Sequence, residues 1–219
     1  MARTFPLASG LFAGRLLVKS CVWQLQESIM SSGYGSGEPL DVELSPAVWT
    51  AEVQLGPLTQ HEAVEQRALI QMHLKPGRPF RLYNRAIPGP RLDPQGLILG
   101  AATPTLHTIG TEGRSLRIGG LPSGYRLSVG DMLSIQFGAS PVKVSLHQVG
   151  EDAQATGGGL TPEFDVDPPI PLGPAVGAAV TLVRASALMI RVPGSYQPGS
   201  TEGSLVTGAG FRAIQTRAW

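Results

Sequence analysis

Residues 59–75 read TQHEAVEQRALIQMHLK, the one stretch of the chain with the pattern of an α-helix. Thr59 and Glu62 form a capping box, in which each side chain satisfies a backbone amide of the first turn. The apolar residues that follow recur at helical spacing and should form the buried face: Val64, Ala68, Leu69 and Met72. Gln66 falls between them and should tolerate a charge. Pro76-Gly77 ends the pattern, so we expect one amphipathic helix laid on a sheet.

The rest of the chain has the composition of short strands separated by turns. It contains 28 Gly and 19 Pro in 219 residues, roughly twice their average share. Strand-like segments are expected at 15–26, 40–44, 48–55, from 80 onward, 105–109, 115–118, 132–137, 142–149, 164–166, 178–183, 188–192 and 210–219. For the last of these strands, an edge position stays open.

Two stretches rich in Gly and Ser, 31–39 and 194–204, should be flexible loops. Between residues 97 and 183 the strands follow one another at regular spacing, with Gly- or Pro-bearing turns between most of them. This spacing is typical of a small barrel or sandwich. The chain is therefore expected to be mainly β with a single helix.

Charge and cysteine content exclude several classes of protein. Charged residues make up only 15% of the chain, and 17 basic against 16 acidic residues give a net charge of +1. No strong field therefore attracts nucleic acid or an anionic membrane, and so few charges suggest a surface partly buried by partners. Cys21 is the only cysteine, so no intrachain disulfide forms. No apolar run approaches the ~18–20 residues that span a bilayer. We expect assembly in the cytoplasm.

No catalytic motif stands out, and we expect no enzyme, cofactor or metal site. The four histidines (His61, His73, His107 and His147) lack metal-ligand spacing and should be solvated or capping. Five carboxylates in one region (Glu151, Asp152, Glu163, Asp165 and Asp167) do not fit a calcium loop. Paired catalytic carboxylates stay open there, beside the simpler interpretation of a solvated loop. Four arginines (Arg78, Arg81, Arg85 and Arg91) indicate an interface or loop-edge role rather than nucleic-acid binding.

Four stretches carry a resemblance to a known family. They are FRLYNR (80–85), LPSGYRLSVGDMLSI (121–135), TLVRASALMIRVPGS (181–195) and GFRAIQT (210–216). Together with the order of strand, glycine-rich loop, strands, capped helix and strand, they resemble siphophage distal tail proteins. The resemblance implies a tail-tube-like β-sandwich or split barrel flanked by one α-helix, with an inserted small β-barrel. The ring (belt) domain would comprise residues 1–91 plus 186–219, and the barrel residues 92–185.

The same resemblance implies a function. Distal tail proteins are structural virion proteins of the phage tail tip. Their copies form a homo-oligomeric ring, typically a hexamer, which joins the tail tube to the baseplate hub and lets DNA pass. The implied partners are the tail tube protein, the hub protein and the tape-measure protein, with neither sequence-specific nucleic-acid binding nor a membrane.

Three alternatives stay open at this point. The first is another tail-tip, hub or tube ring protein, which gene order beside the tape-measure gene would separate from the distal role. The second is a carbohydrate-binding module for host recognition, although the barrel segment supplies only Tyr125, Phe137 and Phe164 and no Trp. The third is a hydrolase that uses the carboxylates between residues 151 and 167.

Overall fold

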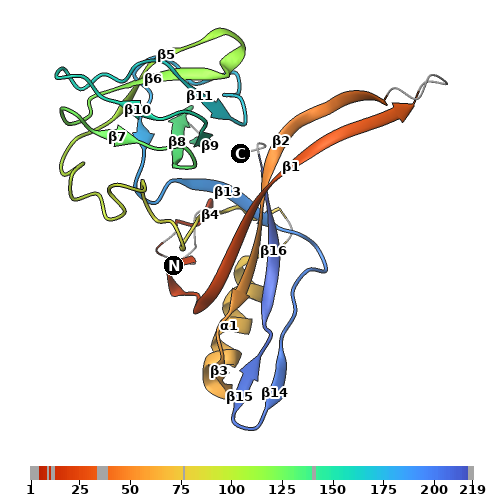
Figure 1. The fold of residues 1–219 in the computed structure, drawn as a ribbon. Coiled ribbons are helices and arrows are strands. Elements are labelled where there is room, and N and C mark those ends of the chain that lie inside the picture. Colours follow the sequence, from red (N-terminus) through yellow and green to blue (C-terminus); the bar gives the residue numbers. More distant parts are fainter. Residues whose placement is uncertain are drawn as a thin grey trace.

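The computed structural model describes residues 5–8, 10, 13–33, 39–75, 77–139 and 142–216. It is mainly β with one α-helix and several antiparallel sheets, one of which is a nearly closed six-stranded barrel (Figure 1). The expectation of a mainly β chain with a flanking helix and a small inserted barrel is confirmed. Among the described residues, no helix is long and apolar enough to cross a bilayer.

A five-stranded antiparallel sheet forms the centre of the first part of the molecule. Its strands, in spatial order, are β1 (Val18–Gly33), β2 (Pro39–Leu55), β16 (Gly210–Gln215), β13 (Ser186–Arg191) and β4 (Phe80–Tyr83). A short 3₁₀-helix, η1 (Ala13–Arg15), precedes β1, so the predicted strand begins later than residue 15. The C-terminal strand β16 lies between β2 and β13, so it is not an edge strand. Its Phe211 and Ala213 are buried in the core of the sheet, which explains the central position.

The strands β1 and β2 are much longer than the sequence pattern indicates. The predicted strands 40–44 and 48–55 are one strand of 17 residues, and residues 31–33 and 39 belong to strands rather than to a loop. Residues 34–38 of that predicted loop, and the side chain of Leu40, lie outside the described residues. Pro46 is accommodated because the pairing of β1 with β2 shifts register beside it, between Gln26 and Ile29.

The helix α1 spans Gln60–His73 and begins with the predicted capping box. The Thr59 amide donates to Glu62 Oε2 at 2.8 Å, and the Glu62 amide donates to Thr59 Oγ1 at 3.4 Å. The predicted buried face was only partly right, because Leu69 is buried whereas Val64, Ala68 and Met72 are exposed. The side chains that α1 buries are Ala63, Gln66, Leu69 and Ile70, followed by Leu74 at the C-cap.

Gln66 was expected to tolerate a charge, and the structure contradicts this. Only 4% of Gln66 is exposed, and its Nε2 donates to the backbone oxygen of Arg15 at 3.3 Å. Two different stripes of residues along α1 recur at helical spacing. The stripe that faces the sheet is the one that includes Gln66. A buried carboxylate at residue 66 would lack the amide donor, so Gln66→Asp should destabilise the fold.

Removing the capping hydroxyl gives a first test of this local structure. Thr59→Ala removes the acceptor for the Glu62 amide and should lower the free energy of unfolding by about 1 kcal/mol. Urea denaturation followed by circular dichroism measures this change. Thr59→Ser keeps the hydroxyl and should remain close to the unmodified protein. An equal loss in both variants would show that the cap contributes nothing.

A small three-stranded sheet lies beside the helix. It consists of β14 (Ser200–Glu202), β15 (Leu205–Thr207) and β3 (Leu58–Thr59), in this order. The predicted loop 194–204 therefore contains a strand, which the sequence did not reveal because all three residues of β14 are exposed. Figure 1 shows this sheet and α1 at the end of the molecule opposite the barrel.

The barrel is inserted between β4 and β13. Its six strands, in spatial order, are β12 (Val180–Thr181), β8 (Met132–Phe137), β9 (Lys143–Val149), β11 (Phe164–Asp167), β6 (Ser115–Gly119) and β5 (Thr105–Ile109). A bridge between Thr105 and Ala179 brings the two ends of this order together. The pair β7 (Arg126–Leu127) and β10 (Ala153–Gln154) and a 3₁₀ turn, η2 (Thr111–Gly113), complete it. Its hydrophobic core is separate from the core around the five-stranded sheet.

One tryptophan ties the barrel to the five-stranded sheet. Trp49 of β2 is buried, and its Nε1 donates to the backbone oxygen of Leu146 in β9 at 2.9 Å. Its backbone amide donates to Gln215 Oε1 of β16 at 3.1 Å. The Leu146 side chain packs in the core of the sheet rather than in that of the barrel. Trp49 is therefore a direct link between the five-stranded sheet and the barrel strand β9.

We expect Trp49→Phe to weaken this link. The substitution keeps an aromatic ring but removes the Nε1 donor, so the buried oxygen of Leu146 loses a partner. The expected cost is about 1–3 kcal/mol in the free energy of unfolding, measurable by chemical denaturation. Tyr83→Phe, in a half-buried position of the same sheet, is the control and should change little. A Trp49→Phe protein as stable as the control would contradict this role.

Candidate interaction surface

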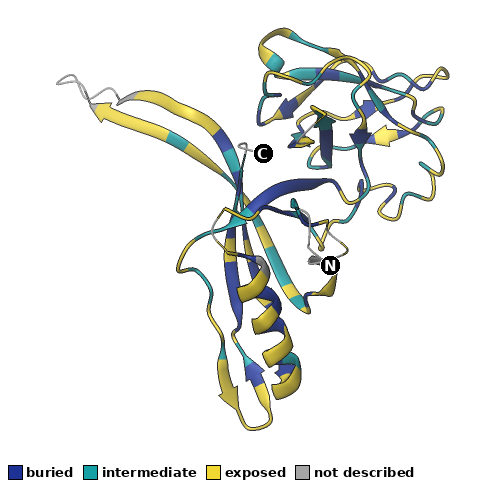
Figure 2. Cartoon of the chain, turned by 180° about the vertical axis from the view of Figure 1, so that it is seen from behind, coloured by how far each residue is buried: buried dark blue, intermediate teal, exposed yellow. Residues whose placement is uncertain are grey.

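The outer halves of β1 and β2 form a hairpin that leaves the body of the molecule. We call residues 26–33 and 39–48 the arm. It projects as a two-stranded ribbon from the point where the strands leave the sheet (Figure 1), and most of its length is exposed (Figure 2). An isolated two-stranded ribbon is at best marginally stable in water. The arm is therefore a candidate surface for contact with a partner.

The two faces of the arm differ in chemistry. Met30 and Val42 are cross-strand partners on one face, and they are 59% and 49% exposed. The cross-strand pair Ile29 and Glu43 belongs to the other face. Leu44, beside a register shift of β2, is also exposed. Exposed apolar side chains concentrated on one ribbon are typical of an interaction site, whereas single ones are not.

The acidic face of the arm looks towards the barrel. Together with barrel residues it lines a cleft of about 310 Å³. The lining side chains are Glu27, Ile29, Asp41, Glu43 and Ala47 from the arm, and Arg114, Asp167 and Pro169 from the barrel. Acidic side chains outnumber the single arginine in this lining, so the cleft favours a positively charged surface over an anionic one.

The outer edge of β1 is open, whereas the opposite edge of the sheet is covered. At β4, the amide of Leu7 donates to the oxygen of Pro79 at 3.1 Å, and the amide of Arg81 donates to the oxygen of Leu7 at 2.9 Å. Along the outer edge of β1, no strand from the described part of the chain pairs. Lys19 is the only lysine of this strand. Unprotected edges of this length pair readily with another chain.

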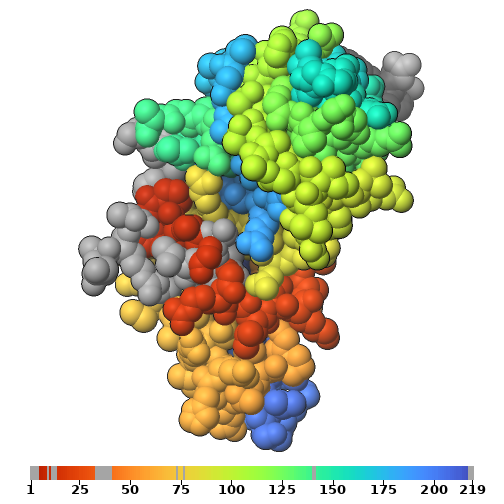
Figure 3. Space-filling view, turned by 90° about the vertical axis from the view of Figure 1, so that its left-hand side faces the viewer, coloured from red at the N-terminus to blue at the C-terminus, as the bar shows by residue number. Residues whose placement is uncertain are grey.

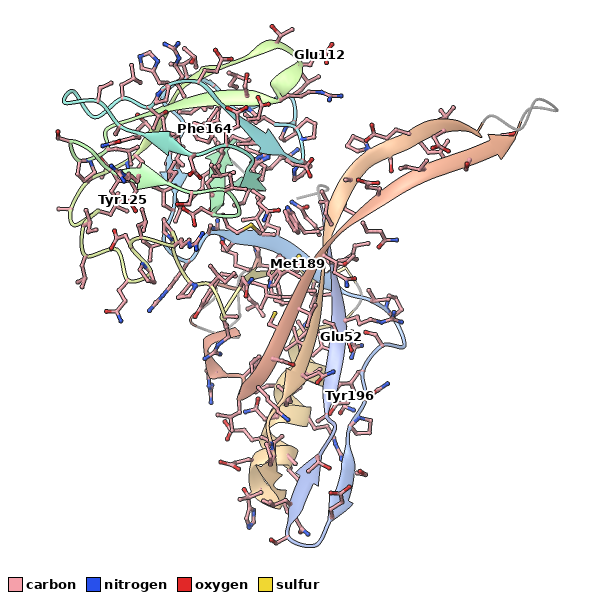
Figure 4. The ribbon with its side chains drawn as sticks, in the orientation of Figure 1. Glu52, Glu112, Tyr125, Phe164, Met189 and Tyr196 are labelled. Atoms are coloured by element: carbon pink, nitrogen blue, oxygen red, sulfur yellow. The ribbon has the colours of Figure 1, made fainter. Side chains whose placement is uncertain are left out.

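The outer face of the sheet at the base of the arm is hollowed and has a mixed polar and apolar lining. A groove of about 440 Å³ crosses β1, β2 and β16. Its polar lining comes from Gln24, Gln26, Thr50, Glu52 and Arg212. Glu52 and Arg212 are cross-strand partners and balance each other in charge; Figure 4 shows Glu52 on this part of the sheet. The groove extends the surface of the arm without adding net charge.

The carboxylates singled out in the sequence do not converge on one buried site. Glu163 accepts a hydrogen bond from Ser115 Oγ, and Asp152 accepts one from the Val129 amide. Asp165 and Asp167 are exposed positions of β11, and Glu151 is exposed in the turn before β10. Within the described ranges, no group of three or more His, Cys, Asp or Glu side chains could hold a metal ion.

Two of the four histidines, His61 and His107, are exposed as expected, and one, His147, is not. His73 is the last residue of α1, and its side chain lies outside the described residues. His147 is buried in β9, and its Nδ1 lies 2.6 Å from the backbone oxygen of Pro168. The prediction of a solvated or capping residue was wrong here. A period of two along β9 places His147 on the same face as Val149, and this signal could have indicated burial.

The arginines hold the N-terminal segment and the end of the helix. Arg78 Nη1 donates to the Met72 oxygen at 3.3 Å, and its guanidinium lies 5.0 Å from the centre of the Phe5 ring. Arg85 Nη1 donates to the Leu16 oxygen at 3.0 Å. Burial lowers the pKa of Arg81. The amide of Arg91 donates to Asp131 Oδ1 at 2.7 Å, which fixes the segment that enters the barrel.

The barrel aromatics are used for packing. Tyr125 and Phe164 are buried in the barrel core, where Figure 4 labels them, and Phe137 is half-buried. Sugar-binding sites rely on exposed aromatic faces. These three residues therefore do not supply the stacking platform that a carbohydrate-binding module needs.

No protein-family model matches this chain, and no curated protein matches it in sequence.

Proposed function

We propose that the chain is a structural virion protein of a long-tailed bacteriophage, a distal tail protein at the tail tip. Its copies would form a homo-oligomeric ring, as a hexamer, that joins the tail tube to the baseplate hub. DNA would pass through the centre of the ring. The tube protein and the hub protein would be its partners, with the tape-measure protein as a further one.

The observation that carries this proposal is the arm. A two-stranded ribbon with exposed apolar side chains and an open edge costs free energy in a lone subunit. The same features stabilise an assembly, because a partner buries the apolar surface and pairs the edge amides. Only 15% of the residues are charged, which also suits a subunit with buried flanks.

A structural role is favoured over the alternatives by the arrangement of side chains. The carboxylates expected for a hydrolase are spread over the surface of the barrel, and its aromatic residues are largely internal. The arm is equally consistent with another ring protein of the tail tip or tube. Co-assembly separates the two, since a distal tail protein should bind both the tube and the hub protein.

The mass of the purified protein tests the proposal. One chain has a mass of 23.0 kDa, so a six-membered ring would have about 138 kDa. Size-exclusion chromatography coupled to light scattering should show a single oligomer whose molar mass corresponds to several copies of the chain. A protein that stays at the mass of one chain at every concentration would contradict a ring-forming role.

A further inference from the structure

We propose that the arm of one copy docks on the exposed face of α1 in a second copy. The inference rests on the proposed self-assembly and names the two surfaces that meet. The first surface is the apolar face of the arm, with Met30 and Val42. The second is an apolar ridge on α1, formed by Val64, Ala68 and Met72.

The ridge on α1 is continuous. Val64 and Met72 are 65% and 62% exposed, and Ala68 between them is exposed as well. Residues four apart on a helix lie one above the other, so the three side chains form a ridge roughly 12 Å long at 1.5 Å per residue. The opposite stripe of α1 packs on its own sheet. The ridge is thus a second apolar face of the same helix, and its own subunit leaves it uncovered.

The two surfaces are compatible in length. A strand advances about 3.3 Å per residue, so a 12 Å ridge covers roughly four residues of each arm strand. Met30 and Val42 are directly opposite each other near the middle of the described arm. A helix that lies along this face would bury apolar side chains on both sides of the contact, which is favourable.

Charge points to the same pairing. Between residues 20 and 48 the sequence has four acidic residues (Glu27, Glu38, Asp41 and Glu43) and no Lys or Arg, a net charge of −4. The helix and the turn after it, residues 59–78, have three basic and two acidic residues, and one of the acidic ones, Glu65, is paired with Arg15. Arg67 and Lys75 are exposed beside the ridge. Because the Debye length is about 8 Å at physiological salt, these charges act across a contact even from the other face of a thin ribbon.

The complementary surface belongs to another molecule. In Figure 1 the arm and α1 extend in different directions from the crossing of β1 and β2, and Figure 3 shows the helix region and the barrel at opposite ends of the subunit. An arm therefore does not lie against its own helix. A contact of arm to helix uses two different surfaces, so it passes from copy to copy and can close into a ring.

Cross-linking between variants that each carry one added cysteine tests the inference. Val42→Cys places a thiol on the arm, and Ala68→Cys places one on the ridge. The two full-length variants, one carrying an affinity tag, are mixed and treated with a short bifunctional maleimide. Burial raises the pKa of the Cys21 thiol to about 11, so the native cysteine reacts poorly. We expect tagged-to-untagged dimers linked through residues 42 and 68, identified by mass spectrometry of the peptides.

A barrel position serves as the matched control. Leu172 is fully exposed on the barrel, and Leu172→Cys mixed with Val42→Cys should give a several-fold lower yield. Equal yields for the two pairs would overturn the inference. Rings seen without a link between 42 and 68 would leave the proposed function standing and refute this contact. A specific link without rings would support the contact and refute the ring.

Discussion

A chain carrying Ala213→Asp should fail to fold. Ala213 lies in the central strand β16, is fully buried and faces the core formed with Phe211 and Met189. A carboxylate there would lose its hydration without a compensating partner, at a cost of several kcal/mol. That loss is comparable to the ~5–15 kcal/mol by which domains are stable. Circular dichroism and limited proteolysis of the purified protein measure the outcome.

The neighbouring residue provides the control. Arg212 is exposed on the other face of β16, so Arg212→Ser should fold and unfold cooperatively. Deletion of residues 210–219 should act like Ala213→Asp, because β2 and β13 would then lack the strand between them. A folded, soluble Ala213→Asp protein would show that the buried face of β16 has been misassigned.

Removal of the arm should have the largest effect on assembly. Residues 29–44 can be replaced by Asn-Gly, a two-residue hairpin turn, between the cross-strand partners Ser28 and Ser45. The side chains described between residues 29 and 44 are all exposed, so the shortened protein should keep its melting temperature within a few degrees. It should nevertheless remain a single chain of about 21 kDa at concentrations where the full chain assembles.

A point variant separates the apolar face from the length of the ribbon. Val42→Lys leaves the hairpin in place but puts a charge on the docking face. Like the replacement of residues 29–44, it should weaken assembly. Val129→Lys, at an exposed position of the barrel, should assemble normally. If the shortened protein formed the same oligomer as the full chain, the arm would have no part in assembly.

Local signals in the sequence predicted much of the fold. The capping box located the start of α1, and turns rich in Gly and Pro separated the barrel strands, so that β5 and β8 have the predicted bounds. The alternation of Phe211 and Ala213 identified β16 as a strand. Each of these features depends on residues close to one another in the chain. The same local preferences that produce the sequence pattern also produce the structure there.

Features that depend on distant parts of the chain were not predictable in this way. Ser31 and Ser32 resemble loop residues, yet they pair with Asp41 and Leu40 across the hairpin. The helical period allowed two buried stripes on α1, and only the position of the sheet selects the one with Gln66 and Ile70. The arm was missed as a site because its side chains follow the alternation of a half-buried strand. The alternation of apolar and polar residues along a strand shows that one face of the strand is apolar. It does not show whether the same chain or another chain buries that face.

Electron micrographs of the purified, negatively stained protein show directly whether the chain forms rings. We expect closed rings of uniform diameter with a central opening, and these should disappear when residues 29–44 are replaced by Asn-Gly. Fields of single particles of the size of one chain, for the full-length protein at concentrations well above those of the assembly assays, would contradict a ring-forming role.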